Sequence, residues 1–404
     1  MLIVNRRKFI QTGSLASAAM MLPKFLKAFE KKKLEQEGKI LVVVQLSGGN
    51  DGLNTVIPYR NDIYYKVRPE LGIRRSDALA MTDELGLHPA LKGLKSLYDD
   101  GSLGVLNNVG YPNPDRSHFR SMDIWQTASG ADQLLTTGWI GRYLDAQCDG
   151  CGHTSGAIEV DDTLSLSLKG KNMRGLAVPD PQRLYASAHD GFFKSLVEDH
   201  HPQEHDHNVD YLYKTLSGTM SSADYIYKQS KIYKTTARYP DSAFGKGLKT
   251  IAELIISGCD TRVYYISLGS FDTHVNQHPQ QQRLFTQLGD GLKIFSEDLR
   301  KNNRFKDVMV ATFSEFGRRV AQNASQGTDH GTANCMFLVS EGMKKQGVLN
   351  QAPDLSHLDQ NNPELGDLIY QVDFRDVYAT LLHQWLHTDD KTVLGEKHKY
   401  LDFI

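Results

Sequence analysis

Hydrophobic residues along the chain form short, nearly continuous runs that are separated by longer amphipathic segments. The first run, at 40–47 (Ile-Leu-Val-Val-Val-Gln-Leu-Ser), is apolar at almost every position and rich in β-branched residues. A strand with one exposed face would alternate apolar and polar residues, so a continuous run indicates a strand covered on both faces. We predict strands of this kind at 40–47, 103–109, 262–268, 307–313 and 334–340.

Between these runs the spacing of apolar residues changes to that of helices. Residues 156–168 alternate with a period of two and predict a strand or hairpin, and residues 179–239 lack strand-like runs and predict a helical insertion. This alternation of strands and helices predicts an α/β fold, with a mixed sheet and helices on both of its faces. The predicted helices are 88–99, 117–126, 138–147, 242–258, 281–302 and 374–386.

The overall composition is that of an ordinary globular protein. The 404 residues carry a formal net charge of −2, with 40% hydrophobic and 23% charged residues. A balance this close to neutral gives no indication of nucleic-acid binding or of an acidic membrane partner. Beyond the N-terminus we expect no transmembrane span, since no apolar stretch is long enough to cross a bilayer.

The N-terminus has a pattern of its own. Residues 5–8 (Asn-Arg-Arg-Lys) precede a modest apolar stretch at 10–22, which is followed by a segment of mixed charge at 24–39. This resembles a twin-arginine signal, which exports folded proteins through the twin-arginine translocase. The alternative is an amphipathic helix with a chance arginine pair. We therefore expect a signal and linker at 1–38, one domain at 39–404, and a periplasmic or extracellular location.

Two groups of residues that bind metals in other proteins receive a different interpretation here. Cys148 and Cys151 form a single CxxC pair, whereas a zinc ribbon requires two, so a local disulfide is expected in an exported protein. Cys259 and Cys335 lie beside apolar runs and are expected to be buried thiols. The histidine-rich segment at 200–207 is polar and acidic, and we interpret it as a solvated loop.

Acidic and histidine residues follow the ends of several predicted strands. A Gly-Gly turn after the strand at 40–47 leads to Asp51, and the loop after 262–268 carries Asp272 and His274. Open α/β sheets place their sites past the carboxyl ends of the strands, so we expect these side chains to meet. Carboxylates and imidazoles gathered in this way hold catalytic divalent metals. The candidate metal ligands are Asp51, Asp272, His274, Glu315, Asp329 and His330.

Three of these residues, Asp51, Asp272 and Glu315, also have an ordinary structural interpretation. Asp51 lies in Asn-Asp-Gly, which fits a turn or a helix cap, and Asp272 fits a helix N-cap. Glu315 fits an ion pair with Arg318. The joint placement of the residues past strand ends, rather than any single motif, favours the metal interpretation.

Ser117 and His118 lie at the predicted start of a helix, where backbone amides favour an anion such as phosphate or sulfate. A serine hydroxyl at such a point can be a nucleophile if a metal lowers its pKa. The alternative is a serine N-cap beside a surface histidine. In a bound ester, His118 would protonate the leaving group, and Arg116 or Arg318 would hold the equatorial oxygens.

Five motifs in a fixed order resemble the DUF1501 family. They are found at 45–54 (Gln-Leu-Ser-Gly-Gly-Asn-Asp-Gly-Leu-Asn), 116–119 (Arg-Ser-His-Phe), 271–274 (Phe-Asp-Thr-His), 314–318 (Ser-Glu-Phe-Gly-Arg) and 328–331 (Thr-Asp-His-Gly). The resemblance covers nearly the whole chain. That family is similar to the alkaline phosphatase/sulfatase superfamily, so the resemblance implies an alkaline-phosphatase-like, mostly parallel sheet with a metal site at its C-terminal edge.

The superfamily pattern also implies roles for individual residues. It places Ser117 at the position of the nucleophile and Asp51 at that of the first-strand metal carboxylate. It implies metal ligands at Asp272, His274, Glu315 and His330. This chain departs from the pattern at Glu315-Phe316, where the superfamily often has Asp-His. Ser117 also lacks the Cys/Ser-x-Pro-x-Arg context of sulfatases, which argues against a formylglycine mechanism.

Taken together, the motifs predict an exported hydrolase of phosphate or sulfate esters that uses one or two divalent ions (zinc, manganese, calcium or magnesium). Its substrate would be a small-molecule or polymeric ester. Because a histidine is missing after Glu315, His118 or Asp329 would supply the absent ligand, or a single ion would bind. The alternative from a different class is a non-catalytic periplasmic binding or assembly protein with a degenerate metal site.

Overall fold

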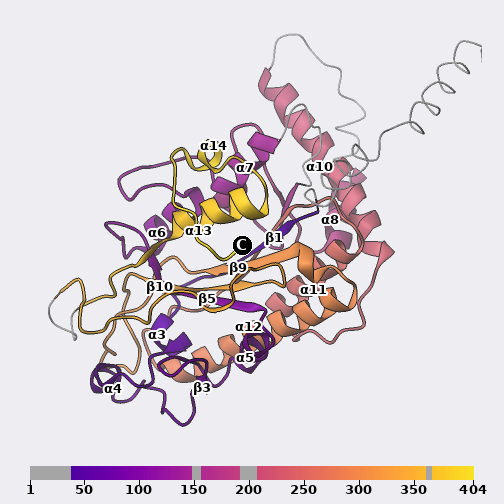
Figure 1. Ribbon diagram of the computed structural model, residues 1–404. Coiled ribbons are helices and arrows are strands. Elements are labelled where there is room, and N and C mark those ends of the chain that lie inside the picture. The colour runs from indigo at the N-terminus through magenta and orange to yellow at the C-terminus, as the bar shows by residue number, and fades with distance from the viewer. Residues whose placement is uncertain (1–37, 148–155, 192–206, 361–365) are drawn as a thin grey trace, which may run out of the picture. The chain divides into compact units, whose positions relative to one another are not determined.

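The computed structural model (Figure 1) describes residues 38–147, 156–191, 207–360 and 366–404. The predicted twin-arginine pattern, the Cys148–Cys151 pair and residues 200–205 lie outside the described residues. Ile40–Ile404 forms one compact unit. Within the described part, no helix is both long and apolar enough to cross a membrane.

The described part contains one large sheet whose central strands are parallel. Its strands are β1 (Ile40–Leu46), β5 (Leu103–Gly110), β6 (Ala157–Glu159), β7 (Leu176–Ala177), β8 (Val263–Leu268), β9 (Val308–Phe313), β10 (Asn334–Val339), β11 (Gly347–Val348) and β12 (Val372–Asp373). They are ordered β11-β5-β10-β9-β1-β8-β6-β7, and β12 pairs with β5. Only β10 runs antiparallel to its neighbours β9 and β5. The mixed, mostly parallel sheet that the sequence predicts is therefore confirmed.

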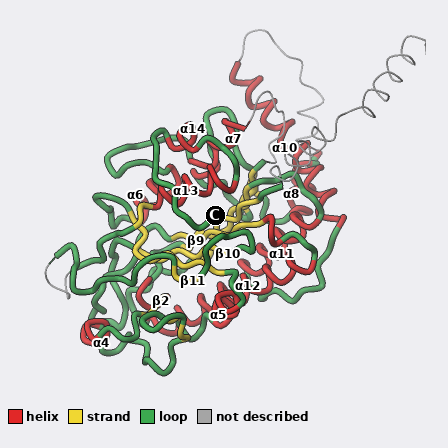
Figure 2. Tube along the Cα trace, in the orientation of Figure 1, coloured by secondary structure: helices red, strands yellow, loops and turns green. Residues whose placement is uncertain are grey.

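Helices cover both faces of this sheet, and Figure 2 shows the strands as one layer between them. Side chains of β1 alternate between two cores: Val42 and Val44 pack with α5, α11 and α12, whereas Leu41 and Val43 pack with α6, α7, α13 and α14. Burial on both sides explains why β1 is apolar throughout. The helices are α3 (Gly52–Thr55), α4 (Asp62–Val67), α5 (Lys92–Asp99), α6 (His118–Thr127), α7 (Trp139–Gln147), α8 (Pro181–Ala188), α10 (His207–Ile232), α11 (Ala243–Ile256), α12 (Gln277–Lys301), α13 (Phe374–Thr380) and α14 (Asp390–Leu394).

The parallel order of β8, β1 and β9 brings three strand ends to one edge of the sheet. Leu46 is paired with Leu268, and Gln45 with Phe313, so the loops that follow these strands start side by side. Because β10 is antiparallel, the segment that precedes Asn334 reaches the same edge. The topology therefore delivers four loops to one place, as expected for the site of an open α/β sheet.

Several elements differ from their predicted form because pairing and packing decide them. The segment 156–168 contains β6, which pairs in parallel with β7 and β8 instead of forming a hairpin. The helix expected from residue 88 begins at Lys92, and the helix expected from 281 begins at Gln277. A small sheet of two-residue strands was not predicted; it consists of β2 (Val56–Ile57), β3 (Leu79–Ala80) and β4 (Gly86–Leu87).

Candidate metal centre

Four side chains converge at the C-terminal edge of the sheet: His118, Asp272, His274 and His330. His118 is the first residue of α6, Asp272 and His274 belong to the loop after β8, and His330 lies shortly before β10. The ligand atoms of His118, Asp272 and His330 all lie within 4.8 Å of one another. The Nε2 atom of His274 lies 3.0 Å from both Asp272 Oδ1 and His330 Nε2.

The His118 ring is held by a buried carboxylate behind it. Its Nδ1 lies 2.9 Å from Glu315 Oε1, and the same oxygen accepts the backbone N–H of Gly48 at 2.8 Å. A carboxylate only accepts hydrogen bonds, so Nδ1 carries the proton and Nε2 presents a lone pair. That Nε2 is buried without a hydrogen-bond partner and lies 3.6 Å from Asp272 Oδ2. Glu315 thus orients His118 rather than facing the centre of the cluster.

The other two imidazoles are fixed in the same way. His274 Nδ1 lies 3.0 Å from Asp329 Oδ1, and His330 Nδ1 lies 2.8 Å from the backbone carbonyl of Arg116. Both partners are acceptors, so each ring donates from Nδ1 and turns the lone pair of Nε2 inward. Metal-binding histidines typically donate their other ring N–H to a carboxylate or a carbonyl in this manner.

These distances fit a divalent metal ion. Ligand atoms bound at about 2.1 Å in a tetrahedral site lie on the order of 3.3 Å apart. The pairs here, at 3.0, 3.0, 3.3 and 3.6 Å, are close to that spacing. The Nε2 atoms of His274 and His330 lie 3.0 Å apart, so two neutral rings that donate from Nδ1 need a shared cation, either a proton or a metal ion, between them. Three imidazoles and one carboxylate favour a transition metal such as zinc over calcium or magnesium.

The charges around the cluster keep these ligands in their binding forms. Burial raises the pKa of Asp272, but the hydrogen bond and the charge of Arg318 outweigh this effect and hold the pKa below its usual value. Burial also lowers the pKa of His330, against the opposing effect of its hydrogen bond to the Arg116 carbonyl. An ionised Asp272 and a neutral His330 are the states in which these groups bind a metal.

Arg318 braces the loops that carry the ligands. Its side chain is fully buried and donates to Asp272 Oδ1 at 2.6 Å, to the Gly49 carbonyl at 2.6 Å and to the Thr328 carbonyl at 2.8 Å. It also donates to the carbonyl of Gly48. One guanidinium thus ties together the loops after β1 and β8 and the segment before β10. Because its donors are engaged, Arg318 does not reach toward a substrate as the sequence suggested.

Gly48 explains how closely these loops approach. Its φ is +116°, and a Cβ at this position would lie 2.5 Å from the backbone nitrogen of Asp272. Only glycine meets both conditions, since L side chains disfavour this backbone region and no space remains for one. The Gly-Gly turn noted in the sequence therefore lets the loop of Asp272 pack directly on the end of β1.

Asp51 lies in a separate, fully buried cluster. Its Oδ2 accepts from Arg68 Nη1 at 2.7 Å and from Gln277 Nε2 at 2.6 Å, and its Oδ1 accepts the N–H of Asn54 at 3.4 Å. Neither Asp51 nor Arg68 exposes its side chain. The positive charge that Asp51 faces is thus supplied by Arg68, and we place Asp51 outside the metal centre. The cap interpretation of Asp51 fits this geometry.

Ser117 and Arg116 border the centre in different ways. Ser117 is exposed at the N-cap of α6, directly before His118, and its backbone N–H donates to Asp115 Oδ1 at 2.7 Å. Arg116 supports the metal centre through its backbone carbonyl, which accepts a hydrogen bond from His330 Nδ1. Its side chain instead pairs with Asp359 and Asp367.

The sequence named all four converging residues but missed the buried network beside them. His118 was assigned as an acid, or as a substitute for the missing metal ligand, and Glu315 was assigned as a ligand. The structure places His118 Nε2 in the cluster, which fits the second role, and Glu315 behind it. Arg68 and Gln277 had no sequence signal, since each is a single polar residue near a helix end. Cys259 and Cys335 are buried and free, which confirms the prediction made for them.

Comparison with solved structures finds proteins of low sequence identity. The lipoteichoic acid synthase LtaP from Listeria monocytogenes is 11% identical with a TM-score of 0.34, over 77% of this chain and 68% of that one. The PsFucS1 sulfatase from Pseudoalteromonas sp. is 11% identical with a TM-score of 0.40, over 92% and 72%. The C-terminal periplasmic domain of EcEptC from Escherichia coli is 12% identical with a TM-score of 0.29, over 75% and 73%.

A comparison with curated proteins finds no match. Residues 185–400 match the model of a family described as a protein of unknown function, DUF1501. The matched region spans more than half of the 404 residues and contains three of the five motifs in the sequence. The chain therefore belongs to the DUF1501 family.

Proposed function

We propose that this protein is a metal-dependent hydrolase of phosphate or sulfate esters. The observation that carries the proposal is the inward orientation of three imidazole Nε2 atoms around Asp272, each ring fixed by an acceptor at Nδ1. Because Nδ1 of each ring is engaged by an acceptor, the Nε2 atoms of His274 and His330, 3.0 Å apart, are placed to share one ion. One centre, held by His118, Asp272, His274 and His330, accounts for this arrangement.

A divalent ion bound there would stabilise negative charge that develops on the ester and lower the pKa of a nearby hydroxyl. Ser117 supports the role of nucleophile, because it is exposed and directly precedes His118 at the start of α6. The first amides of that helix have no intrahelical acceptor and favour an anion. Since the side chains of Arg116 and Arg318 are engaged in ion pairs, these amides would hold the anionic oxygens of the ester.

Of the two roles that the sequence offered for His118, general acid and substitute metal ligand, this proposal takes the second. Its Nδ1 proton is directed at Glu315, and its Nε2 faces Asp272. The ring is therefore a metal ligand in this proposal. A water molecule at the solvent-exposed side of the site would protonate the leaving group. Asp329 and Glu315 act as positioning residues for His274 and His118.

The protein would act in the periplasm or outside the cell, after export of the folded chain through the twin-arginine translocase. That route agrees with a centre that is assembled from four distant loops, because folding precedes translocation and the ion can bind first. A fusion of residues 1–38 to a reporter, with Arg6 and Arg7 changed to Lys in a control, tests this step. Export that persists in the control would contradict it.

A second candidate is a non-catalytic binding or assembly protein that uses the metal centre for structure. The observation that favours it is the placement of Asp51 and Glu315, which face Arg68 and His118 instead of a second ion. The hydrolase and the binding protein are distinguished by one observation, which is whether the metal-loaded protein hydrolyses an ester.

The test combines metal analysis with turnover of phosphate monoesters, phosphate diesters and sulfate esters. We expect hydrolysis of at least one class by the zinc- or manganese-loaded protein. We expect loss of turnover in Ser117→Ala with metal content retained, and unchanged turnover in Ser76→Ala, an exposed serine outside the site. A loaded protein that hydrolyses none of these esters would contradict the hydrolase and support the binding protein.

A further inference from the structure

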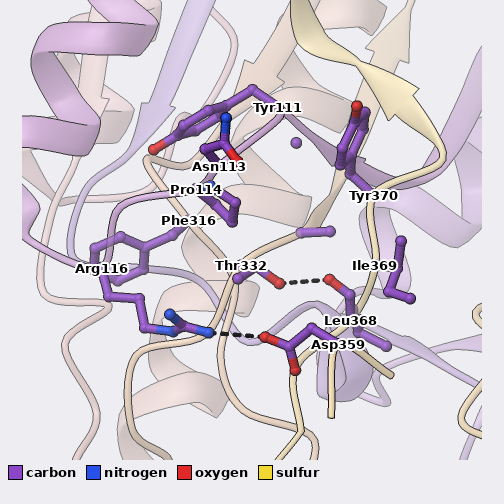
Figure 3. Close-up of a pocket in the computed structure, with 12 residues that line it drawn as sticks. Tyr111, Asn113, Pro114, Arg116, Phe316, Thr332, Asp359, Leu368, Ile369 and Tyr370 are labelled. Carbon is purple, nitrogen blue, oxygen red and sulfur yellow. Dashed lines mark hydrogen bonds and ion pairs between the residues drawn. The ribbon is translucent and has the colours of Figure 1, made fainter. Parts of the chain in front are cut away.

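A cavity of about 380 Å³ lies directly beside the candidate metal centre. This volume falls within the range of about 300–1,000 Å³ typical of small-molecule sites. Figure 3 shows the rings of Tyr111 and Tyr370 at the top of the cavity, the ring of Phe316 at the left, and the ion pair between Arg116 and Asp359 below them. The lining residues that matter for its chemistry are Tyr111, Asn113, Arg116, Phe316, Asp359 and Tyr370.

Two residues connect this cavity to the metal centre. The Phe316 ring lines the cavity, and its centroid lies 4.9 Å from that of His118 and 4.6 Å from that of His330. Arg116 lines the cavity with its side chain and accepts from His330 Nδ1 with its carbonyl. A group in the cavity would therefore be separated from the metal ligands by one aromatic ring.

The electrostatics of the rim argue against an anionic occupant. The Arg116 guanidinium pairs with Asp359 at 3.0 Å and also with the buried Asp367, and Arg319 lies 4.0 Å from Asp367, so the charges of the rim are already paired with one another. An anion brought to this rim would have to displace a carboxylate from Arg116. The charged part of an ester is thus expected at the metal centre and the start of α6, and its uncharged part in the cavity.

The remaining chemistry favours a ring that is apolar on its faces and polar at its edge. Tyr370 is partly exposed and offers a flat surface for C–H groups, because aromatic faces carry partial negative charge, whereas the buried Phe316 ring forms the wall toward the metal ligands. At the rim, Asn113 supplies both donors and an acceptor, and each carboxylate oxygen of Asp359 has two lone pairs. A purely hydrophobic ring would displace water from Asn113 and from the remaining lone pairs of Asp359 without offering hydrogen bonds in return.

We propose that this cavity is a hexose subsite, which holds the uncharged sugar ring of a carbohydrate phosphate or sulfate ester. The link to an ester rests on the proposed function, whereas binding of the sugar ring itself does not. Hydroxyl groups at the ring edge would exchange hydrogen bonds with Asn113 and Asp359, and the ring face would pack on Tyr370. The substrate class is therefore a glycan ester rather than an alkyl or aryl ester.

Binding of uncharged probes tests the subsite without relying on turnover. Methyl glycosides of glucose, galactose and mannose would be titrated into the full chain and followed by saturation-transfer NMR. We expect saturable binding of at least one glycoside, weakened about tenfold or more by Tyr370→Ala and about fivefold by Asp359→Asn. Tyr400→Ala, which removes a partly exposed tyrosine outside the cavity, should leave binding unchanged. Circular dichroism of each variant would verify folding.

A further variant separates this proposal from the hydrolase. Asp272→Ala removes a metal ligand that does not line the cavity, so glycoside binding should stay within twofold of the wild type while zinc is lost. Glycoside binding without turnover of any ester would support the proposed hexose subsite and contradict the proposed hydrolase function. Absence of saturable binding for all three glycosides would overturn the subsite. Tighter, Tyr370-dependent binding of cyclohexanol or 4-nitrophenol than of any glycoside would also overturn it.

Discussion

Replacement of Arg68 by methionine is expected to destabilise the fold by about 3–5 kcal/mol, because it leaves the buried Asp51 carboxylate without its cation. The ion pair is 2.7 Å long, and neither side chain is exposed. Arg68 also donates to the carbonyls of Val320 at 2.7 Å and Arg319 at 2.8 Å, whose loss adds to the cost. Methionine retains much of the apolar stem, so most of the effect is electrostatic.

The assay is urea unfolding at pH 7, followed by circular dichroism. Arg68→Met, Asp51→Asn and the double variant form a cycle, and the double variant should recover part of the loss because no unpaired charge remains. Zinc content should be the same in the wild type and the double variant, since Asp51 lies outside the proposed centre. A loss below about 1 kcal/mol in Arg68→Met, or zinc that disappears with Asp51→Asn in a folded protein, would refute the reasoning.

Three further outcomes follow from named contacts. Glu315→Gln should weaken zinc affinity about 10- to 100-fold, measured by competition with a chelator, because the carboxylate no longer fixes His118; an unchanged affinity would contradict this role. Gly48→Ala should cost more than about 2 kcal/mol in unfolding free energy, since its φ is +116° and its Cβ would lie 2.5 Å from backbone. Gly101→Ala is the control, with φ +76° and open space around the Cβ, and should cost only about 1 kcal/mol. Burial raises the pKa of Glu159 to about 7, against opposing hydrogen bonds from Ser165. The stability that Glu159 contributes is thus fully present below pH ~4.5 and is lost as pH rises through ~7. Glu159→Gln should therefore gain stability relative to the wild type at pH 8 but not at pH 5, and equal differences at both values would exclude this explanation.

The strands of the central sheet could be predicted because a strand that is buried on both faces is apolar at almost every position. The run at 40–47 becomes β1 over Ile40–Leu46, and 307–313 becomes β9 over Val308–Phe313. Short strands such as β11 and β12 could not be predicted, since two-residue elements are defined by the partner strand and carry no periodicity. The same limit applies to β6, whose partners come from distant parts of the chain.

The candidate site was predictable to the extent that its residues follow strand ends. Asp272 and His274 were found because the loop after β8 must lie at the carboxyl edge of the sheet. The division of roles was not predictable, since Glu315 and Asp51 differ from ligands only in what their oxygens contact. Arg68 decides the role of Asp51, and a single arginine at a helix end gives no sign of burial.

The central claim is that one divalent ion binds where three imidazoles and Asp272 meet. Its most direct test is elemental analysis with zinc titration of the purified chain, of His330→Ala and of His278→Ala, a partly exposed histidine outside the cluster. The account predicts one equivalent of tightly bound metal in the wild type and in His278→Ala, and its loss in His330→Ala. Equal metal content in all three proteins, or none in the wild type after zinc loading, would contradict it.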